Sequence, residues 1–143
     1  MIEEKEILKS YKYEDLTQEC KDNLAILLDK VNKIRKAYAK PLTVTSGYRS
    51  EKDQIRIYEE KAQKAGKPFD IKKVPLKSKH LVCAAVDLYD PNKELQEWIL
   101  RNIPLMEEIG VWFESFSATP NWTHVQVLPY GSWKPGKSIF FIP

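Results

Sequence analysis

Residues 78–87 read Ser-Lys-His-Leu-Val-Cys-Ala-Ala-Val-Asp, and this stretch decides how the rest of the chain is interpreted. Residues 82–89 are mostly apolar, so we predict a buried strand there. Alternation along that strand places Asp87 on the face opposite Val86. An Asp in so apolar a run is costly unless it is paired, bound to a metal or used to cap a backbone turn. His80 immediately precedes the strand and is one of only two histidines in the chain.

The second histidine lies in a similar setting. Residues 121–126 read Asn-Trp-Thr-His-Val-Gln, and we predict a strand over residues 123–128. His124 and Gln126 then point to one side, while Val125 points into the core. Taken alone, His124 fits a hydrogen-bonded structural residue as well as it fits a ligand.

Together the two segments predict a metal site formed by His80, Asp87 and His124. Two imidazoles and one carboxylate are a known ligand set for catalytic zinc, which keeps a further position for water. Strands hold such ligands more precisely than loops do. We therefore expect one Zn²⁺ per chain, which would lower the pKa of its bound water to about 7.

Glu114 is the best candidate for a general base. We predict a strand over residues 110–116, on which Glu114 leaves the core face and lies between Trp112 and Phe116. Aromatic neighbours would raise the pKa of this carboxyl toward a useful value. An ordinary solvated glutamate at a strand end is the alternative.

Arg49 is a candidate for binding a carboxylate or stabilising an oxyanion. It lies in the segment Thr-Ser-Gly-Tyr-Arg-Ser, residues 45–50, where a strand gives way to a helix. Its guanidinium suits bidentate binding of carboxylates. The alternative is a surface arginine that pairs with Glu51 or Asp53.

The remaining pattern predicts an α+β fold with a mostly antiparallel sheet and helices packed on one face. Apolar residues at spacings of three and four indicate an amphipathic helix over 14–38, which Pro41 stops. We also predict helices over residues 50–65 and 93–102, with Asn92 capping the latter, and strands over residues 42–45 and 138–142.

Composition fits a single domain over residues 1–143. The net charge of +3 is small, and the lysines at 72, 73, 77 and 79 are the only basic cluster, a weak hint of an acidic substrate. We expect no nucleic-acid or membrane partner and a monomer. Cys20 and Cys83 fit no CxxC or zinc-finger spacing, and two lone cysteines are more often buried small apolar residues than a bridge. Residues 1–10 lack an apolar signal segment, so we expect a cytoplasmic protein in the producing cell.

Three motifs in this order resemble the zinc D-alanyl-D-alanine peptidases of the M15 type, which share a fold with the hedgehog signalling domain. They are SGYRS (46–50), SKHLVCAAVD (78–87) and NWTHVQ (121–126). The likeness is strongest over residues 42–143. The run of residues 112–126 is similar to the small, phage-associated branch of that family.

The resemblance implies a role for each matching residue. His80, Asp87 and His124 match the zinc ligands, Arg49 the substrate-stabilising arginine, and Glu114 the catalytic glutamate of the phage-like branch. Substrate contacts are expected from the side chains of Ser78, Tyr48 and Gln126. The chain departs from the family at two positions. Asn121 stands where many members have the glutamate, and Cys83 stands where Gly is common, adding bulk or a further thiolate beside the site.

We therefore expect a zinc peptidase that cuts a stem peptide of bacterial peptidoglycan, as a carboxypeptidase or as an endopeptidase of the endolysin type. The enzyme would act on the wall after release from the cell or as part of a phage particle. A non-catalytic zinc-binding structural or wall-binding module of the same fold is the main alternative. A metal-dependent nuclease would need more carboxylates than the one strong Asp.

Overall fold

The computed structural model describes residues 1–143 and contains a five-stranded sheet in the order β1-β2-β4-β3-β5. Its strands are β1 (Val44–Ser46), β2 (Ala85–Tyr89), β3 (Trp112–Glu114), β4 (Trp122–Gln126) and β5 (Phe140–Phe141). Neighbouring strands run antiparallel except β3 and β5, which are parallel. The predicted α+β class with a mostly antiparallel sheet is confirmed.

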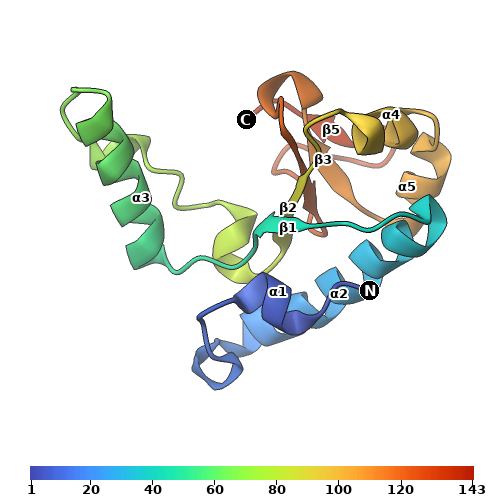
Figure 1. Ribbon diagram of the computed structural model, residues 1–143, viewed down its shortest axis with the longest axis horizontal. Coiled ribbons are helices and arrows are strands. Elements are labelled where there is room, and N and C mark those ends of the chain that lie inside the picture. Colours follow the sequence, from blue (N-terminus) through green and yellow to red (C-terminus); the bar gives the residue numbers. More distant parts are fainter.

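One face of the sheet forms the core with the long helix α2 (Gln18–Tyr38). The side chains of Val86, Phe113 and Val125 are fully buried on that face. Opposite them, α2 contributes the predicted apolar stripe to the same cluster, with Cys20, Leu24, Leu27, Val31 and Ile34 all buried. In Figure 1 this helix runs beneath the sheet, together with the short helix α1 (Glu4–Leu8).

Helix α2 begins later than predicted. Residues Tyr13–Asp15 form a separate 3-10 turn, and the hydroxyl of Thr17 accepts a hydrogen bond from the Cys20 N–H at 3.1 Å. This N-cap fixes the start of the helix at Gln18, because it satisfies one of the free amides of the first turn. The helix ends where Ala39 adopts a left-handed conformation, two residues before Pro41.

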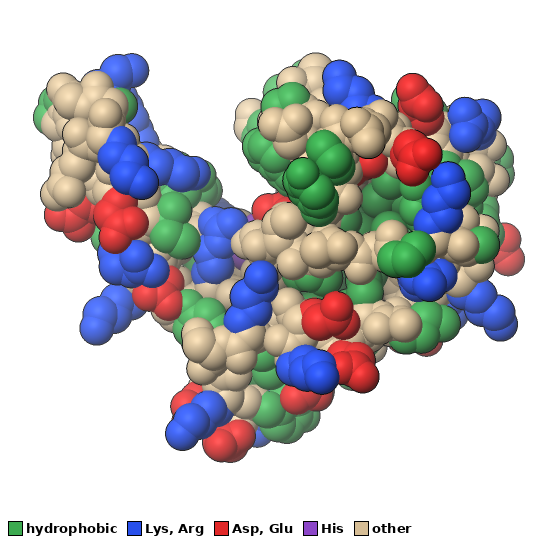
Figure 2. All heavy atoms as spheres, viewed as in Figure 1, with side chains coloured by type: hydrophobic (Ala, Val, Ile, Leu, Met, Phe, Trp, Pro, Cys, Tyr) green, Lys and Arg blue, Asp and Glu red, His purple; other side chains and the backbone are tan.

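Helix α3 (Glu51–Lys64) stands away from the rest of the molecule, as Figure 1 shows. Ser50 caps it as predicted, accepting from the Asp53 N–H at 3.1 Å. Gln54 is its only buried side chain, so α3 is anchored near its first turn. Figure 2 shows a hollow between α3 and the body, with Lys and Arg side chains gathered on the α3 side.

Two short helices cover the far end of the sheet, α4 (Glu94–Leu100) and α5 (Ile103–Ile109). The prediction of one helix over residues 93–102 is therefore wrong in extent, and α5 was not predicted. Asn92 is not the cap of α4. The buried carboxylate of Asp90 takes that role, accepting from the N–H groups of Leu95 and Gln96 at 3.1 and 3.0 Å.

The strands are shorter than predicted or displaced by a few residues. Residues Lys79–Val82 form a 3-10 turn that ends at Cys83, so β2 starts at Ala85 rather than at residue 82. This turn lifts His80 out of the sheet and aims it at the strand that follows. None of the helices is both long and apolar enough to cross a membrane.

Candidate metal centre

Three adjacent strands carry polar residues on the sheet face opposite the core. Asp87 of β2 is the direct antiparallel partner of His124 of β4, so both side chains leave the same face. Trp112 of β3 pairs with Gln126 on that face, and alternation brings Glu114 to it as well. The strand register thus places a carboxylate, an imidazole and a second carboxylate side by side.

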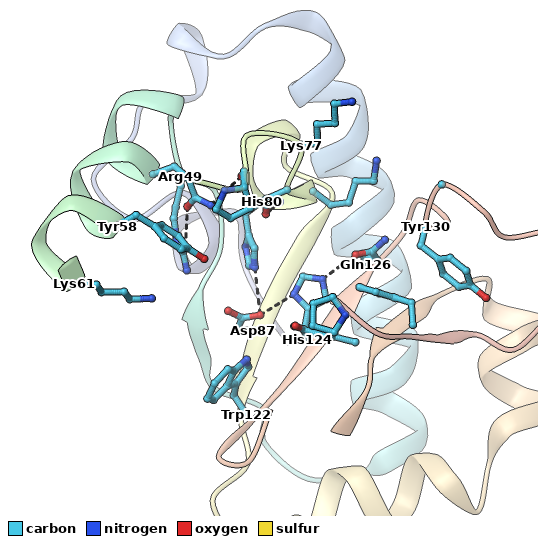
Figure 3. A pocket seen from close by; sticks show the side chains of 18 residues that line it. Arg49, Tyr58, Lys61, Lys77, His80, Asp87, Trp122, His124, Gln126 and Tyr130 are labelled. Atoms are coloured by element: carbon cyan, nitrogen blue, oxygen red, sulfur yellow. Dashed lines mark hydrogen bonds and ion pairs between the residues drawn. The ribbon is translucent and has the colours of Figure 1, made fainter. Parts of the chain in front are cut away.

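The three expected ligands meet in one cluster (Figure 3). One Asp87 carboxylate oxygen lies 3.3 Å from His80 Nε2 and 3.0 Å from His124 Nδ1. One ligand atom from each of the three residues lies within 4.8 Å of the others. The polar contacts of the Asp87 carboxylate are the two imidazoles, and it caps no backbone turn. The alternative role of Asp87 as the cap of a backbone turn is therefore not formed.

The 3-10 turn of Lys79–Val82 sets the orientation of His80. Ser78 caps the turn, its hydroxyl accepting from the His80 N–H at 3.3 Å. The ring Nδ1–H donates to the Gly47 carbonyl at 2.8 Å. This bond fixes the orientation of the ring, so His80 Nε2 faces Asp87.

Gln126 sets the orientation of His124 in the same way. Its amide oxygen accepts from His124 Nε2–H at 2.9 Å, and its own NH₂ donates to the Leu128 carbonyl at 2.8 Å. His124 therefore turns Nδ1 toward Asp87. Gln126 lines the cavity described below, although its side chain is only 3 % exposed and is occupied with His124 and Leu128. Its expected contact with substrate stays a prediction.

The donor set fits a zinc ion. It offers two imidazole nitrogens and one carboxylate oxygen, the ligand types that zinc takes in open, three-ligand sites. Each imidazole also has a hydrogen-bond acceptor on its other nitrogen, as metal-binding histidines usually do. Burial favours the neutral form of Asp87, but the hydrogen bonds from His124 and His80 outweigh it and hold the pKa of this carboxyl well below its usual range.

Burial opposes a charge on His124, but the hydrogen bond to Asp87 and its negative charge outweigh burial and raise the His124 pKa. Bound metal would replace the proton that this imidazole shares with Asp87. A metal ion bound here would therefore compete with a proton for the same nitrogen.

Arg49 keeps its charge free for a ligand. Its guanidinium donates to the Ser46 hydroxyl at 3.1 and 2.6 Å and to the Gln54 amide oxygen at 3.0 Å. Gln54 is itself buried and donates to the Pro75 carbonyl at 3.2 Å. None of the ion pairs includes Arg49, so the alternative of a partner at Glu51 or Asp53 is not formed.

Glu114 is half-buried beside the cluster. Burial, joined by the negative charge of Asp87, raises the pKa of its carboxyl, although His124 and His80 act in the opposite direction. None of the ion pairs includes Glu114, and it faces the cavity described next. A half-buried carboxyl with a raised pKa beside a cluster of ligand-type residues is a candidate for proton transfer.

These residues line a cavity of about 530 Å³, shown in Figure 3. Arg49, Ser78 and Glu114 share it with the cluster. Tyr48, expected to contact substrate, is not among its lining residues, because its ring packs edge-to-face on Tyr11 with centroids 4.7 Å apart. Sequence reasoning did not identify several lining residues, namely Gln54, Tyr58, Lys61, Pro75, Trp122, Tyr130, Gly131, Phe141 and Pro143.

Cys83 lies outside the cavity and is fully buried with Cys20 in the core. Burial raises the pKa of its thiol, which makes it an inert apolar group and argues against the expected extra thiolate. Its φ of 59° lies in the left-handed region. Gly adopts that region without strain, which agrees with the Gly that the resemblance leads one to expect at this position.

Comparison with known proteins gives one family. The family model described as VanY, D-alanyl-D-alanine carboxypeptidase, matches residues 13–126, which include His80, Asp87, Glu114 and His124. Searches of curated proteins and of solved structures give no significant match.

Proposed function

Because the chain belongs to the VanY family of D-alanyl-D-alanine carboxypeptidases, a peptidase family of cell-wall metabolism, we propose that it is a zinc enzyme acting through the site described above. Membership establishes the M15-type fold and a peptide of peptidoglycan as the substrate class. The zinc ion, the residue roles and the bond that is cut are our proposals. The observation that carries them is the meeting of two imidazoles and two carboxylates from β2, β3, β4 and the 3-10 turn.

His80 Nε2, Asp87 Oδ1 and His124 Nδ1 would hold the zinc ion. When bound, zinc supplies a Lewis acid for the scissile carbonyl and an acidified water. Gly47 and Gln126 keep the two imidazoles turned toward the ion. Their hydrogen bonds limit the freedom of both rings before the metal arrives.

Glu114 would move the proton. Its carboxylate accepts a proton from the attacking water at one oxygen and passes it to the nitrogen of the leaving amine. A raised pKa suits both halves of this task, because the carboxylate is then a stronger base than an ordinary glutamate and can still return the proton. Phe141, the β5 partner of Glu114, helps to keep this carboxyl away from bulk water.

Arg49 would bind the substrate. Ser46 and Gln54 hold the guanidinium at the cavity wall, and no carboxylate of the chain neutralises it. It can therefore accept the free C-terminal carboxylate of a stem peptide or the oxyanion that forms at the scissile carbonyl. The hydroxyl of Ser78, at the mouth of the same cavity, would contact the peptide backbone.

The test is hydrolysis of defined muropeptides by the zinc-loaded protein. We expect cleavage of a stem peptide ending in D-Ala-D-Ala, and Glu114→Gln should lower kcat by about 10²- to 10⁴-fold. Zinc content should stay at one ion per chain. Glu107→Gln, which makes the same change at an exposed position of α5, is the matched control and should keep full activity.

Two results would count against the proposal. Full activity in Glu114→Gln would remove this residue from the reaction. A protein that binds zinc yet cuts neither linear nor cross-linked muropeptides would instead fit the non-catalytic metal-binding module. The products also identify the bond, since a carboxypeptidase releases free D-Ala whereas the endopeptidase predicted for an endolysin separates cross-linked dimers.

A further inference from the structure

Positive charge is concentrated in one segment of the chain. Residues 61–79 contain seven lysines and a single acidic residue, Asp70, although the whole chain has a net charge of only +3. The Asp70 carboxylate is already used, because it accepts from the Lys72 N–H at 3.0 Å as the cap of a 3-10 turn. None of the seven lysines forms an ion pair. The segment therefore presents uncompensated charge.

Three of these lysines belong to the cavity itself. Lys61 reaches it from the last turn of α3, Lys77 from the loop that returns from α3, and Lys79 from the start of the 3-10 turn that contains His80. In Figure 3 the Lys61 side chain extends toward the metal cluster, on the same side as Arg49 and Tyr58. Its ammonium lies over the Tyr58 ring, 4.8 Å from the centroid, which limits the directions it takes.

We propose that Lys61, Lys77 and Lys79 form a binding site for a second carboxylate of the substrate, in addition to the group that Arg49 binds. This inference rests on the proposed function and narrows its substrate class to acidic peptides. The cavity contains four cationic side chains and two acidic ones, Asp87 and Glu114. One free C-terminal carboxylate would occupy Arg49 alone and leave three ammonium groups without a partner.

A metal ion makes the excess larger. Asp87 would be committed to the cation, and the metal would bring positive charge of its own. A neutral peptide would leave these charges unmatched, whereas a peptide with an acidic group near the scissile bond would compensate them. Lysine suits this role because its flexible stem can follow a carboxylate at more than one position of the peptide.

The experiment compares two peptides that differ in one group. Both end in D-Ala-D-Ala, and one has a free carboxylate on the residue before these two where the other has a carboxamide. A second pair places the same difference one residue further from the scissile bond. For at least one pair we expect kcat/KM to be about tenfold higher for the acid. This is the ratio that results when a few exposed ion pairs each contribute a small free energy of binding. Raising the salt concentration should shrink this preference.

Two triple variants locate the effect. Lys61→Gln/Lys77→Gln/Lys79→Gln should lower the ratio of kcat/KM for the acid to kcat/KM for the carboxamide peptide from about tenfold to about one. Lys64→Gln/Lys67→Gln/Lys72→Gln removes the same charge from the same segment, but none of its residues lines the cavity. This control should keep the preference.

Equal rates for acid and carboxamide in both pairs would overturn the inference. Equal loss in both triple variants would also overturn it, because the cause would then be the overall field of the protein. Calorimetric binding of the same peptides to the zinc-loaded protein tests the site even where neither peptide is cut. Failure of hydrolysis would thus count against the proposed function, and failure to prefer the acid against the lysine site.

Discussion

Gln126 controls the direction of His124, so it should control metal affinity without touching the metal. Gln126→Leu keeps a side chain of similar size but leaves the His124 Nε2–H and the Leu128 carbonyl without their partners. We expect zinc affinity to fall by about 10- to 100-fold, the usual effect of losing such a partner. Competition with a chromophoric chelator would measure this.

Gln126→Glu is the informative companion variant. Its carboxylate still accepts from His124 Nε2–H but can no longer donate to the Leu128 carbonyl, so zinc affinity should be higher than that of Gln126→Leu. Tight zinc binding by Gln126→Leu, equal to that of the wild type, would contradict the role we give this residue.

The candidate catalytic and metal-binding residues could be predicted from the sequence, whereas the residues that hydrogen-bond to them and orient them could not. His80, Asp87, His124 and Glu114 stand out because charged or polar residues interrupt apolar strands. Ser46, Gly47 and Gln54 give no such signal, since they act through a hydroxyl, a backbone carbonyl and a buried amide. Only the fold reveals which ring or guanidinium each of them meets.

Among the elements, α4 depends on a residue outside its own first turn. Asp90 is buried and accepts from the backbone of Leu95 and Gln96 and from the Thr123 hydroxyl at 3.3 Å, which ties α4 to β4. Asp90→Ala should lower the free energy of unfolding by about 2–3 kcal/mol, because it removes a cap and leaves buried donors unpaired. Urea unfolding would measure the loss.

Asp90→Asn separates capping from packing. Its amide keeps one acceptor oxygen and should recover part of the stability. Asp90 does not line the cavity, so zinc content should stay at the wild-type level in both variants. A loss of zinc in the folded Asp90→Ala protein would show that α4 supports the metal site, contrary to this expectation.

Element bounds were the least predictable part of the fold. The long stripe of α2 identified that helix, but α1 and α5 were missed because five to seven residues are too few to show a period. Val82, the last residue of the 3-10 turn, was predicted to begin the strand that in fact starts at Ala85, since an apolar residue suits either conformation. Tertiary packing, not local preference, decides in such segments.

For the whole molecule, the two titrating ligands set the pH dependence of stability. The pKa of His124 is raised in the folded protein. Its contribution to stability is therefore complete at pH values below the pKa of an ordinary histidine, and it is lost as pH rises through the pKa of the folded protein. The pKa of Asp87 is lowered in the folded protein. Its contribution to stability is therefore complete at pH values above the pKa of an ordinary aspartate, and it is lost as pH falls through the pKa of the folded protein. The metal-free protein should therefore be most stable between about pH 4 and 6.5.

Above pH 6 the zinc-bound protein should gain stability as pH rises, whereas the metal-free protein should lose it. A metal ion binds His124 only after its proton has left, so the stabilisation by zinc grows as pH rises. At a free zinc concentration of about 1,000 Kd the gain is about 4 kcal/mol. Thermal unfolding from pH 5 to 8, with chelator and with zinc, would measure both curves. Two parallel curves would contradict the proposed competition between proton and metal.

The overall shape could not be predicted from the sequence. The amphipathic pattern of residues 50–65 indicated a helix, and its start at Ser50 was predicted from the capping signal. Nothing in that pattern said that α3 would stand away from the sheet, because the direction of a helix depends on the few residues that anchor it. The depth of the cavity and its lysine-rich wall follow from that direction.

The contact between Gly47 and α1 shows which residues a shortened protein must keep to preserve the metal site. A Cβ on Gly47 would lie 2.8 Å from the Ile7 Cα, and the next N–H along the chain, that of Tyr48, donates to the Ile7 carbonyl at 3.0 Å. The Gly47 carbonyl in turn positions His80. Yet the family match begins only at residue 13. A protein truncated to the matched residues would lose α1, and with it the contact that holds Gly47, whose carbonyl orients the proposed metal ligand His80.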